Sequence, residues 1–142
     1  MNRICHLLEY KGRQVETIDA NATVADAVAK MNARRIGSVV VTRGDVLAGI
    51  LTERDVMTRI VAQGHDPRAI EVCEVMTTDL VTVEPDTPIA TALRLVSDKR
   101  CRHLPVVEGH RVIGLVSGGD LTAWLLRDQE RTIYDLQDFI TH

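Results

Sequence analysis

Two aspartates follow a hydroxyl residue at the same short spacing, in Thr52-x-x-Asp55 and Ser117-x-x-Asp120. A hydroxyl residue with an acidic residue three positions later is typical of the capping box that starts a helix. The same arrangement suits a nucleotide, because helix N–H groups and the helix dipole attract phosphate. The aspartate, one turn into the helix, can accept hydrogen bonds from both hydroxyls of a ribose. From the residues alone, both uses remain open.

A basic pair, Arg102-His103, precedes an apolar run that contains Pro105. Its simplest interpretation is a solvent-facing pair at the start of a strand. Cys101 and His103 also have the spacing of a thiol nucleophile and its base on one strand face. However, no acidic or amide residue that could orient the histidine is evident, and Cys101 aligns with the apolar Ile36 in the repeat described below. We therefore expect a core cysteine and no enzyme.

Composition and motifs exclude several classes of protein. The net charge is -3 and no basic block occurs, so we expect no nucleic-acid partner. No apolar run approaches the ~18 residues of a membrane span, and the N-terminus has no long apolar core of a secretory signal. The histidines show no metal-binding spacing, so no metal is expected to be required. The three cysteines are widely spaced, which favours reduced thiols and a cytoplasmic location.

The elements that position the two aspartates form a repeat with an offset of 65 residues, from Asp55 to Asp120. Apolar positions, turns and several identical residues match along the repeat without an insertion. The sequence predicts a first repeat at 15–64, a connector at 65–79 and a second repeat at 80–127. Helical segments are expected at 1–14 and 128–142, the latter docked on the body of the chain or on a second copy.

Each repeat is predicted to have the order β-α-β-β-α. In the first repeat, a strand at 15–18 precedes a helix that begins at Thr23, a hairpin at 38–51 and a helix from Thr52. The matching lead strand of the second repeat is expected at 80–83. The residues expected on the buried faces of the two first-repeat helices are Val24, Ala27, Val28 and Met31, then Val56, Met57, Ile60 and Val61. The predicted fold class is α+β, with tandem repeats packed around a pseudo-two-fold axis.

Three features together resemble a pair of CBS domains, also called a Bateman module. They are the duplicated glycine-apolar-apolar-Thr/Ser-x-x-Asp pattern, the run Arg102-His103-Leu104-Pro105-Val106-Val107, and Val75-Met76-Thr77 at the end of the connector. The resemblance covers roughly residues 12–127. Thr52-Glu53-Arg54-Asp55 is particularly similar to stand-alone bacterial CBS pairs, which carry no attached enzyme or channel.

The resemblance implies a non-catalytic regulatory module that binds AMP, ADP or ATP in clefts between two CBS units. S-adenosylmethionine or NAD(H) as ligand, and a ligand-independent dimerisation module, are the alternatives. A homodimer is expected, together with a regulated protein partner that the sequence does not identify. The nucleotide-binding residues implied by the resemblance are Ser38, Thr52, Arg54, Asp55, Arg102, His103, Pro105, Ser117 and Asp120.

The resemblance also implies that the two sites are unequal. Arg102 and His103 would contact the phosphates of the nucleotide whose ribose binds Asp55. Gly37 and Ser38 occupy the matching positions of the first repeat and carry no charge. We therefore expect the Asp55 site to bind more phosphate charge than the Asp120 site.

Overall fold

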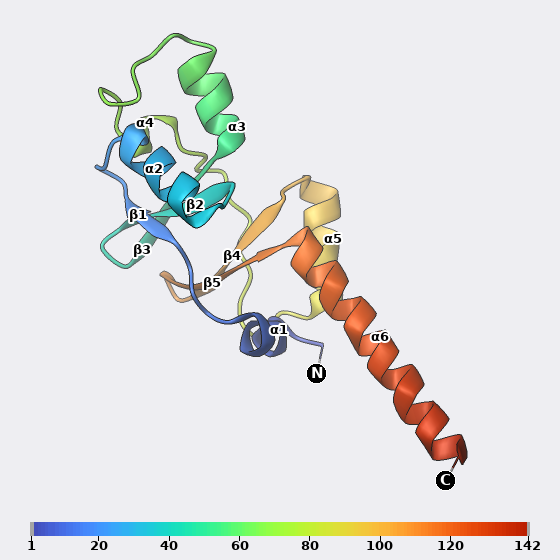
Figure 1. Ribbon diagram of the computed structural model, residues 1–142. Helices are drawn as coiled ribbons and strands as arrows, with labels where there is room; N and C mark the ends of the chain where they lie inside the picture. Colours follow the sequence, from blue (N-terminus) through green and yellow to red (C-terminus); the bar gives the residue numbers. More distant parts are fainter. Residues whose placement is uncertain (1, 142) are drawn as a thin grey trace. The chain divides into compact units, whose positions relative to one another are not determined.

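The computed structural model describes residues 2–141, and the chain divides into two compact units (Figure 1). The first-repeat unit contains Gln14–Leu80 and Val107–Ile113. The second-repeat unit contains Met1–Arg13, Val81–Val106 and Gly114–His142. Each unit therefore includes residues that the sequence places outside its repeat: the first takes up the predicted connector and Val107–Ile113, and the second takes up the N-terminal helix. The predicted pseudo-two-fold axis concerns the arrangement of the units and stays a prediction.

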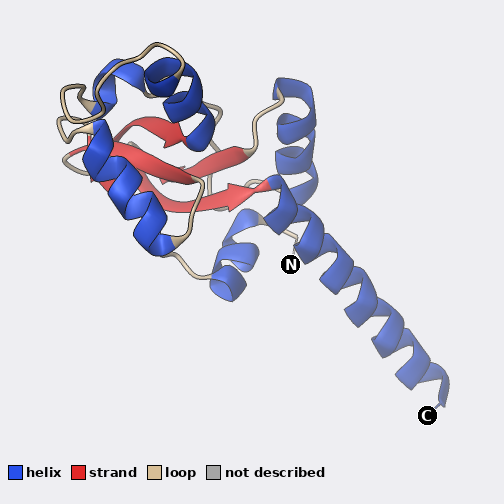
Figure 2. Ribbon diagram, turned by 45° about the horizontal axis from the view of Figure 1, so that its top comes forward, coloured by secondary structure: helices blue, strands red, loops and turns tan. Residues whose placement is uncertain are grey.

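In the first-repeat unit, helices pack on one face of a small sheet (Figure 2). The sheet has β1 (Thr17–Asp19) parallel to β2 (Ser38–Arg43), and β2 antiparallel to β3 (Val46–Thr52). The helices are α2 (Val24–Arg34), α3 (Glu53–Val56), the π-helical η1 (Met57–Val61) and α4 (Val72–Val75). The core of this unit is aliphatic and includes Val24, Ala27, Met31, Val39, Val41, Leu51, Ile60, Val72 and Val75.

The second-repeat unit has a related set of elements preceded by its own helix. Helix α1 (Ile4–Lys11) lies within the helical segment predicted at 1–14, and it buries Ile4, Leu7 and Leu8. It is joined by α5 (Ile89–Lys99), α6 (Gly118–Thr141) and most of the hairpin β4 (His103–Glu108) and β5 (Arg111–Ser117). The tip of this hairpin belongs to the first-repeat unit, where Arg111 pairs with Val46. The α+β class with tandem repeats is therefore confirmed.

The predicted lead strand at 80–83 is wrong, and two prolines explain the difference. In the first repeat, the N–H of Val40 donates to the Glu16 carbonyl and the N–H of Ala20 donates to the Thr42 carbonyl. Pro105 and Pro85 stand at the two donor positions of the second repeat. Proline has no N–H to donate, so both ladder bonds are lost.

One contact of this lost ladder remains in the second-repeat unit. Val83 forms an isolated parallel bridge with Val106, and its N–H donates to the Pro105 carbonyl at 3.0 Å. The equivalent pair in the first repeat, Ile18 and Val41, lies inside the β1–β2 ladder. The register of the two repeats is therefore the same, although only one forms a strand.

The predicted buried face of the helix that follows Thr52 is half right. Ile60 is buried and Val56 is partly buried, whereas Met57 is 61% exposed and Val61 is 69% exposed. The change from α-helix to π-helix at Met57 adds residues to each turn, so the apolar positions leave the 3.6-residue spacing on which the prediction rested. Val28 of α2, also predicted to be buried, is 36% exposed.

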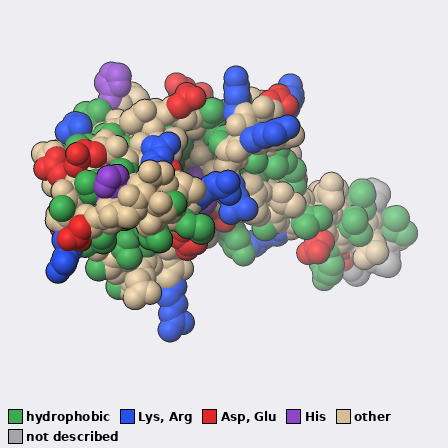
Figure 3. Space-filling model, turned by 90° about the horizontal axis from the view of Figure 1, so that it is seen from above, with side chains coloured by type: hydrophobic (Ala, Val, Ile, Leu, Met, Phe, Trp, Pro, Cys, Tyr) green, Lys and Arg blue, Asp and Glu red, His purple; other side chains and the backbone are tan. Residues whose placement is uncertain are grey.

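Helix α6 runs without interruption from Gly118 to Thr141, so the predicted helical tail continues the last helix of the second repeat. Residue 142 of that tail lies outside the described residues. The C-terminal half of α6 is not covered by its own unit, and apolar side chains gather on its surface (Figure 3). Ile133, Leu136 and Ile140 of this half are 56%, 58% and 81% exposed.

Candidate functional site

Both Thr/Ser-x-x-Asp patterns form the capping box that the sequence predicts. In the first repeat, the Thr52 hydroxyl accepts from the Asp55 N–H at 3.1 Å and Asp55 accepts from the Thr52 N–H at 3.0 Å. In the second repeat, the corresponding bonds between Ser117 and Asp120 are 3.0 and 2.9 Å. Each aspartate is thus fixed at the start of a helix by hydrogen bonds with its capping partner.

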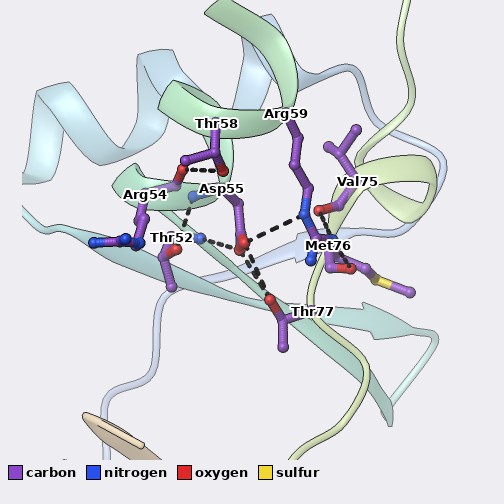
Figure 4. Close-up of polar contacts among 8 residues, drawn as sticks. All are labelled: Thr52, Arg54, Asp55, Thr58, Arg59, Val75, Met76 and Thr77. Atoms are coloured by element: carbon purple, nitrogen blue, oxygen red, sulfur yellow. Dashed lines mark hydrogen bonds and ion pairs between the residues drawn. The ribbon is translucent and has the colours of Figure 1, made fainter. Parts of the chain in front are cut away.

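The Asp55 carboxylate has a neutral hydroxyl as its nearest side-chain partner and an arginine farther away, and its side chain is only 10% exposed. The Thr77 hydroxyl lies 3.1 and 3.2 Å from the two carboxylate oxygens (Figure 4). Arg59 approaches to 3.9 Å, and it also donates to the carbonyls of Val75 and Met76. The residues that follow α4 therefore hold Asp55, and this explains how Val75-Met76-Thr77 contributes to the first repeat.

Asp120 has a cationic partner instead. The Lys11 ammonium lies 2.6 Å from Asp120 Oδ2 and 2.6 Å from the Leu115 carbonyl, and the Asp120 side chain is 29% exposed. Burial alone would raise the pKa of Asp120, but the hydrogen bonds from Lys11 and Ser117 outweigh it and hold the pKa below its usual value. Asp120 is therefore fully ionised near neutral pH.

A hollow of about 460 Å³ lies beside the start of α6, and all of its lining residues belong to the second-repeat unit. It is lined by Val96, Arg100, Cys101, Arg102, His103, Ser117, Gly118 and Gly119. The Gly118 N–H donates to the Arg102 carbonyl at 3.1 Å, which joins the basic pair to the helix start. Cationic side chains beside the N-terminus of a long helix form a suitable environment for an anion.

His103 is half-buried in this environment, and its pKa is lowered. Burial is the main cause, and the positive charge of Lys11 adds to it; Arg102 has the same effect, while Asp120 opposes it. His103 is therefore mostly neutral at pH 7 in the unliganded protein. A phosphate placed beside it would favour the imidazolium form and so raise this pKa.

The equivalent surface of the first repeat has the opposite character. Gly37 lies against the Glu53 side chain: a Cβ at Gly37 would come within 3.0 Å of Glu53 Oε1. The Glu53 N–H donates to the Gly37 carbonyl at 2.9 Å, just as Gly118 donates to Arg102 in the second repeat. A carboxylate thus lies at the first helix start, where the second helix start has two glycines next to basic side chains.

The other predicted site residues are placed as follows. Arg54 is exposed on α3, whereas Ser38 is buried at the start of β2 and Pro105 is buried in β4. The structure brings Arg102, His103 and Ser117 together in one unit, and it brings Thr52 and Asp55 together in the other. A nucleotide held by Asp55 that also contacts Arg102 and His103 would involve residues of both units, so this arrangement stays a prediction.

The list of predicted site residues omits Arg100, Lys11 and Thr77. Arg100 lines the hollow and has φ of +53°, and its counterpart Arg35 has φ of +55°. An arginine at the same position of both repeats is the sequence signal that could have identified this helix end. Lys11 precedes the first repeat but contacts the second, and Thr77 precedes the second repeat but contacts the first. A linear pattern does not show against which repeat such a segment packs.

The comparisons with known proteins agree with the geometry of both units. The CBS domain family matches residues 9–62 and 72–127. The CBS domain-containing protein YhcV of Bacillus subtilis is 37% identical over 108 residues, which cover 76% of each protein. CBSX3, a mitochondrial CBS domain-containing protein of Arabidopsis thaliana, is 36% identical over 123 residues; these cover 83% of this chain but only 60% of CBSX3.

A solved structure extends the agreement to three dimensions. A protein with CBS domains from Burkholderia ambifaria MC40-6 superimposes with a TM-score of 0.81 at 37% identity, covering 89% of this chain and 96% of that one. CBS domains are generally regulatory and bind adenosine-containing ligands. The family match to both repeats and this superposition show that the chain belongs to the CBS domain family and carries a CBS pair.

Proposed function

We propose that this chain is a regulatory module that binds an adenosine nucleotide, with AMP, ADP and ATP as the expected ligands. The observation that carries the proposal is the hollow at the start of α6, where Arg100, Arg102 and His103 lie beside Ser117. It provides a place for phosphate in a chain that also has two aspartates fixed at helix starts. This combination suits a ligand with both a ribose and a phosphate.

Within the proposal, each group has a distinct role. Asp55 and Asp120 accept hydrogen bonds from ribose hydroxyls, and Thr52 and Ser117 hold the two carboxylates in place. Arg102 and His103 bind phosphate, with Arg54 as a further cation for it. Ser38 and Pro105, both buried at strand positions, form part of the wall of the binding site and carry no charge.

Binding would act on a partner by population shift, because a ligand biases two arrangements of the module only by its different affinity for each. The regulated partner is a protein rather than a nucleic acid, since the chain has a net charge of -3. We place the protein in the cytoplasm, where Cys5, Cys73 and Cys101, all free thiols in the structure, would stay reduced. Among residues 2–141, no helix is both long and apolar enough to cross a membrane.

Titration calorimetry tests the proposal with AMP, ADP, ATP, S-adenosylmethionine and NADH. We expect the three adenine nucleotides to bind, and Arg102→Gln to weaken them. A response to S-adenosylmethionine or NADH alone would move the assignment to those ligands. If none of the five ligands binds at millimolar concentration, the chain does not sense nucleotides.

A second candidate function is a dimerisation module, favoured by the exposed apolar side chains on the C-terminal half of α6. A structural relative, the CBS-CP12 protein of bloom-forming cyanobacteria, is described as hexameric; it is 30% identical with a TM-score of 0.73 and coverages of 86% and 70%. We propose that this chain forms a homodimer through α6. Light scattering on a chain without residues 128–142 should then give the monomer mass, and an unchanged mass would remove this role from the tail.

A further inference from the structure

Lys11 joins the N-terminal helix to the second aspartate. Its ammonium lies 2.6 Å from Asp120 Oδ2 and equally close to the Leu115 carbonyl, so it takes two oxygen partners at once. Asp120 Oδ2 also accepts the Ser117 N–H at 2.9 Å. One oxygen of the carboxylate is therefore already shared between two donors.

The packing of α1 places Lys11 at this position. The N–H groups of Ile4 and Cys5 donate to the carbonyls of Thr87 and Pro85, which fixes the first turn of the helix. Near its other end, Leu8 lies so close to Gly114 that a Cβ there would come within 2.8 Å of Leu8 Cδ2. Lys11 follows one turn later, so its reach to Asp120 results from packing that the helix makes along its length.

Aromatic contacts hold the same end of α1. The Tyr10 ring lies 5.8 Å from the Trp124 ring of α6, and the Arg127 guanidinium lies 3.8 Å above Tyr10. Trp124 is the one tryptophan of the chain. Its fluorescence therefore reports whether the end of α1, with Lys11, stays in place.

The first repeat has no such cation at the equivalent position. By the 65-residue offset, Met76 corresponds to Lys11. Its sulfur faces Gly49, and the Asp55 carboxylate binds the Thr77 hydroxyl instead. The fold thus accommodates a methionine at this position, and a cation occupies this position in the second repeat only.

We propose that Lys11 is a specificity-determining residue of the second aspartate site, where it competes with the ribose of a ligand for the Asp120 carboxylate. This inference rests on the proposed function. A ribose hydroxyl must displace the ammonium or share the carboxylate with it, whereas at Asp55 it competes with the Thr77 hydroxyl and a longer ion pair, in which Arg59 lies 3.9 Å away. The competition is modest, because a partly exposed ion pair contributes about 1 kcal/mol or less.

The test isolates the second site in an Asp55→Ala background and uses adenosine, which has the ribose hydroxyls but no phosphate. We expect Lys11→Met to tighten adenosine binding by about fivefold, which corresponds to a pair of that strength. Lys11→Arg retains the ion pair and should leave binding as it was. The affinity for 2′,3′-dideoxyadenosine, which lacks the competing hydroxyls, should not respond to Lys11→Met.

Two controls keep the outcomes distinct. Trp124 emission should be the same in all variants before ligand is added, which shows that α1 remains docked. If AMP binds the wild-type chain but Lys11→Met leaves adenosine affinity unchanged or weakens it, the competition is refuted and the proposed function stands. If AMP does not bind the wild-type chain, the proposed function and this inference fall together.

Discussion

The two aspartates of this chain have the same place in their repeats and different surroundings. Asp55 is almost buried and is held by a threonine hydroxyl, with Arg59 at 3.9 Å, whereas Asp120 is more exposed and paired with a lysine at 2.6 Å. The helix starts beside them also differ in charge, with Glu53 at the first and basic side chains around the second. The comparison shows that a duplicated fold keeps its backbone geometry while the charges around each copy diverge.

The largest expected effect is the loss of Asp55, the carboxylate that has no lysine bonded to it. Asp55→Ala should raise the Kd for AMP by roughly tenfold or more, because it removes hydrogen bonds to a charged group worth about 1.5–3 kcal/mol. Asp120→Ala should raise it by about fivefold or less, since Lys11 already occupies that carboxylate. Calorimetry on both variants measures the two Kd values. Thermal unfolding is the control for the lost capping box, whose removal lowers the stability of each variant by about 1 kcal/mol. Equal effects of the two changes would break the comparison.

The next effect concerns phosphate. Arg102→Gln should weaken ATP binding by about tenfold and adenosine binding hardly at all, because a charged hydrogen bond to phosphate is absent from the nucleoside. Arg54→Gln is the comparison variant: it removes another exposed arginine, which the proposal makes only a further cation for phosphate, and it should change ATP binding by less than about threefold. A larger loss from Arg54→Gln would place the phosphates at the first helix start.

His103 gives a smaller effect that depends on pH. Its pKa is lowered in the unliganded protein, so lowering the pH through that value protonates it and creates a cation for phosphate. Between about pH 7.5 and 6, wild-type binding of AMP should therefore strengthen relative to His103→Gln. Expressing the result as the ratio of the two Kd values cancels the titration of the AMP phosphate itself. A ratio that does not vary with pH would show that His103 does not face phosphate.

The smallest effect separates stability from binding at the paired arginines. Arg35 and Arg100 both have positive φ, a conformation that glycine adopts without the cost paid by L side chains. Arg35→Gly and Arg100→Gly should each raise the free energy of unfolding by about 0.5–1 kcal/mol in denaturant titrations. Only Arg100→Gly should also weaken ATP binding, because only Arg100 lines the hollow. Loss of ATP binding in both variants would remove this distinction.

Much of this comparison could be predicted from the sequence, and the exceptions have physical reasons. The capping boxes, the hairpins and α1 follow local rules of spacing and capping, which a linear pattern records. The lead strand is missing because Pro85 and Pro105 lack the N–H groups that donate in the first repeat. This effect can be seen only when the two repeats are aligned and the donors of the first repeat are known. The exposure of Met57 and Val61 depends on a π-helical turn that has no clear sequence signal.

The site residues divide in the same way. Asp55, Asp120 and their capping partners could be identified from spacing, because the capping box is local. Lys11 and Thr77 could not, since their contacts join residues that are 109 and 22 positions apart. Each lies in a segment that completes a repeat from outside it, which makes long-range packing the deciding factor.

A double-mutant cycle tests the central claim, that the two sites are unequal, most directly. It measures the Kd for ATP in the wild-type chain, Asp55→Ala, Arg102→Gln and the double variant, with a second cycle that replaces Asp55→Ala by Asp120→Ala. If one nucleotide is held by Asp55 and Arg102, the first cycle should show a coupling free energy of about 1 kcal/mol or more, and the second should be additive. Coupling to Asp120 instead, with additivity at Asp55, would contradict the account.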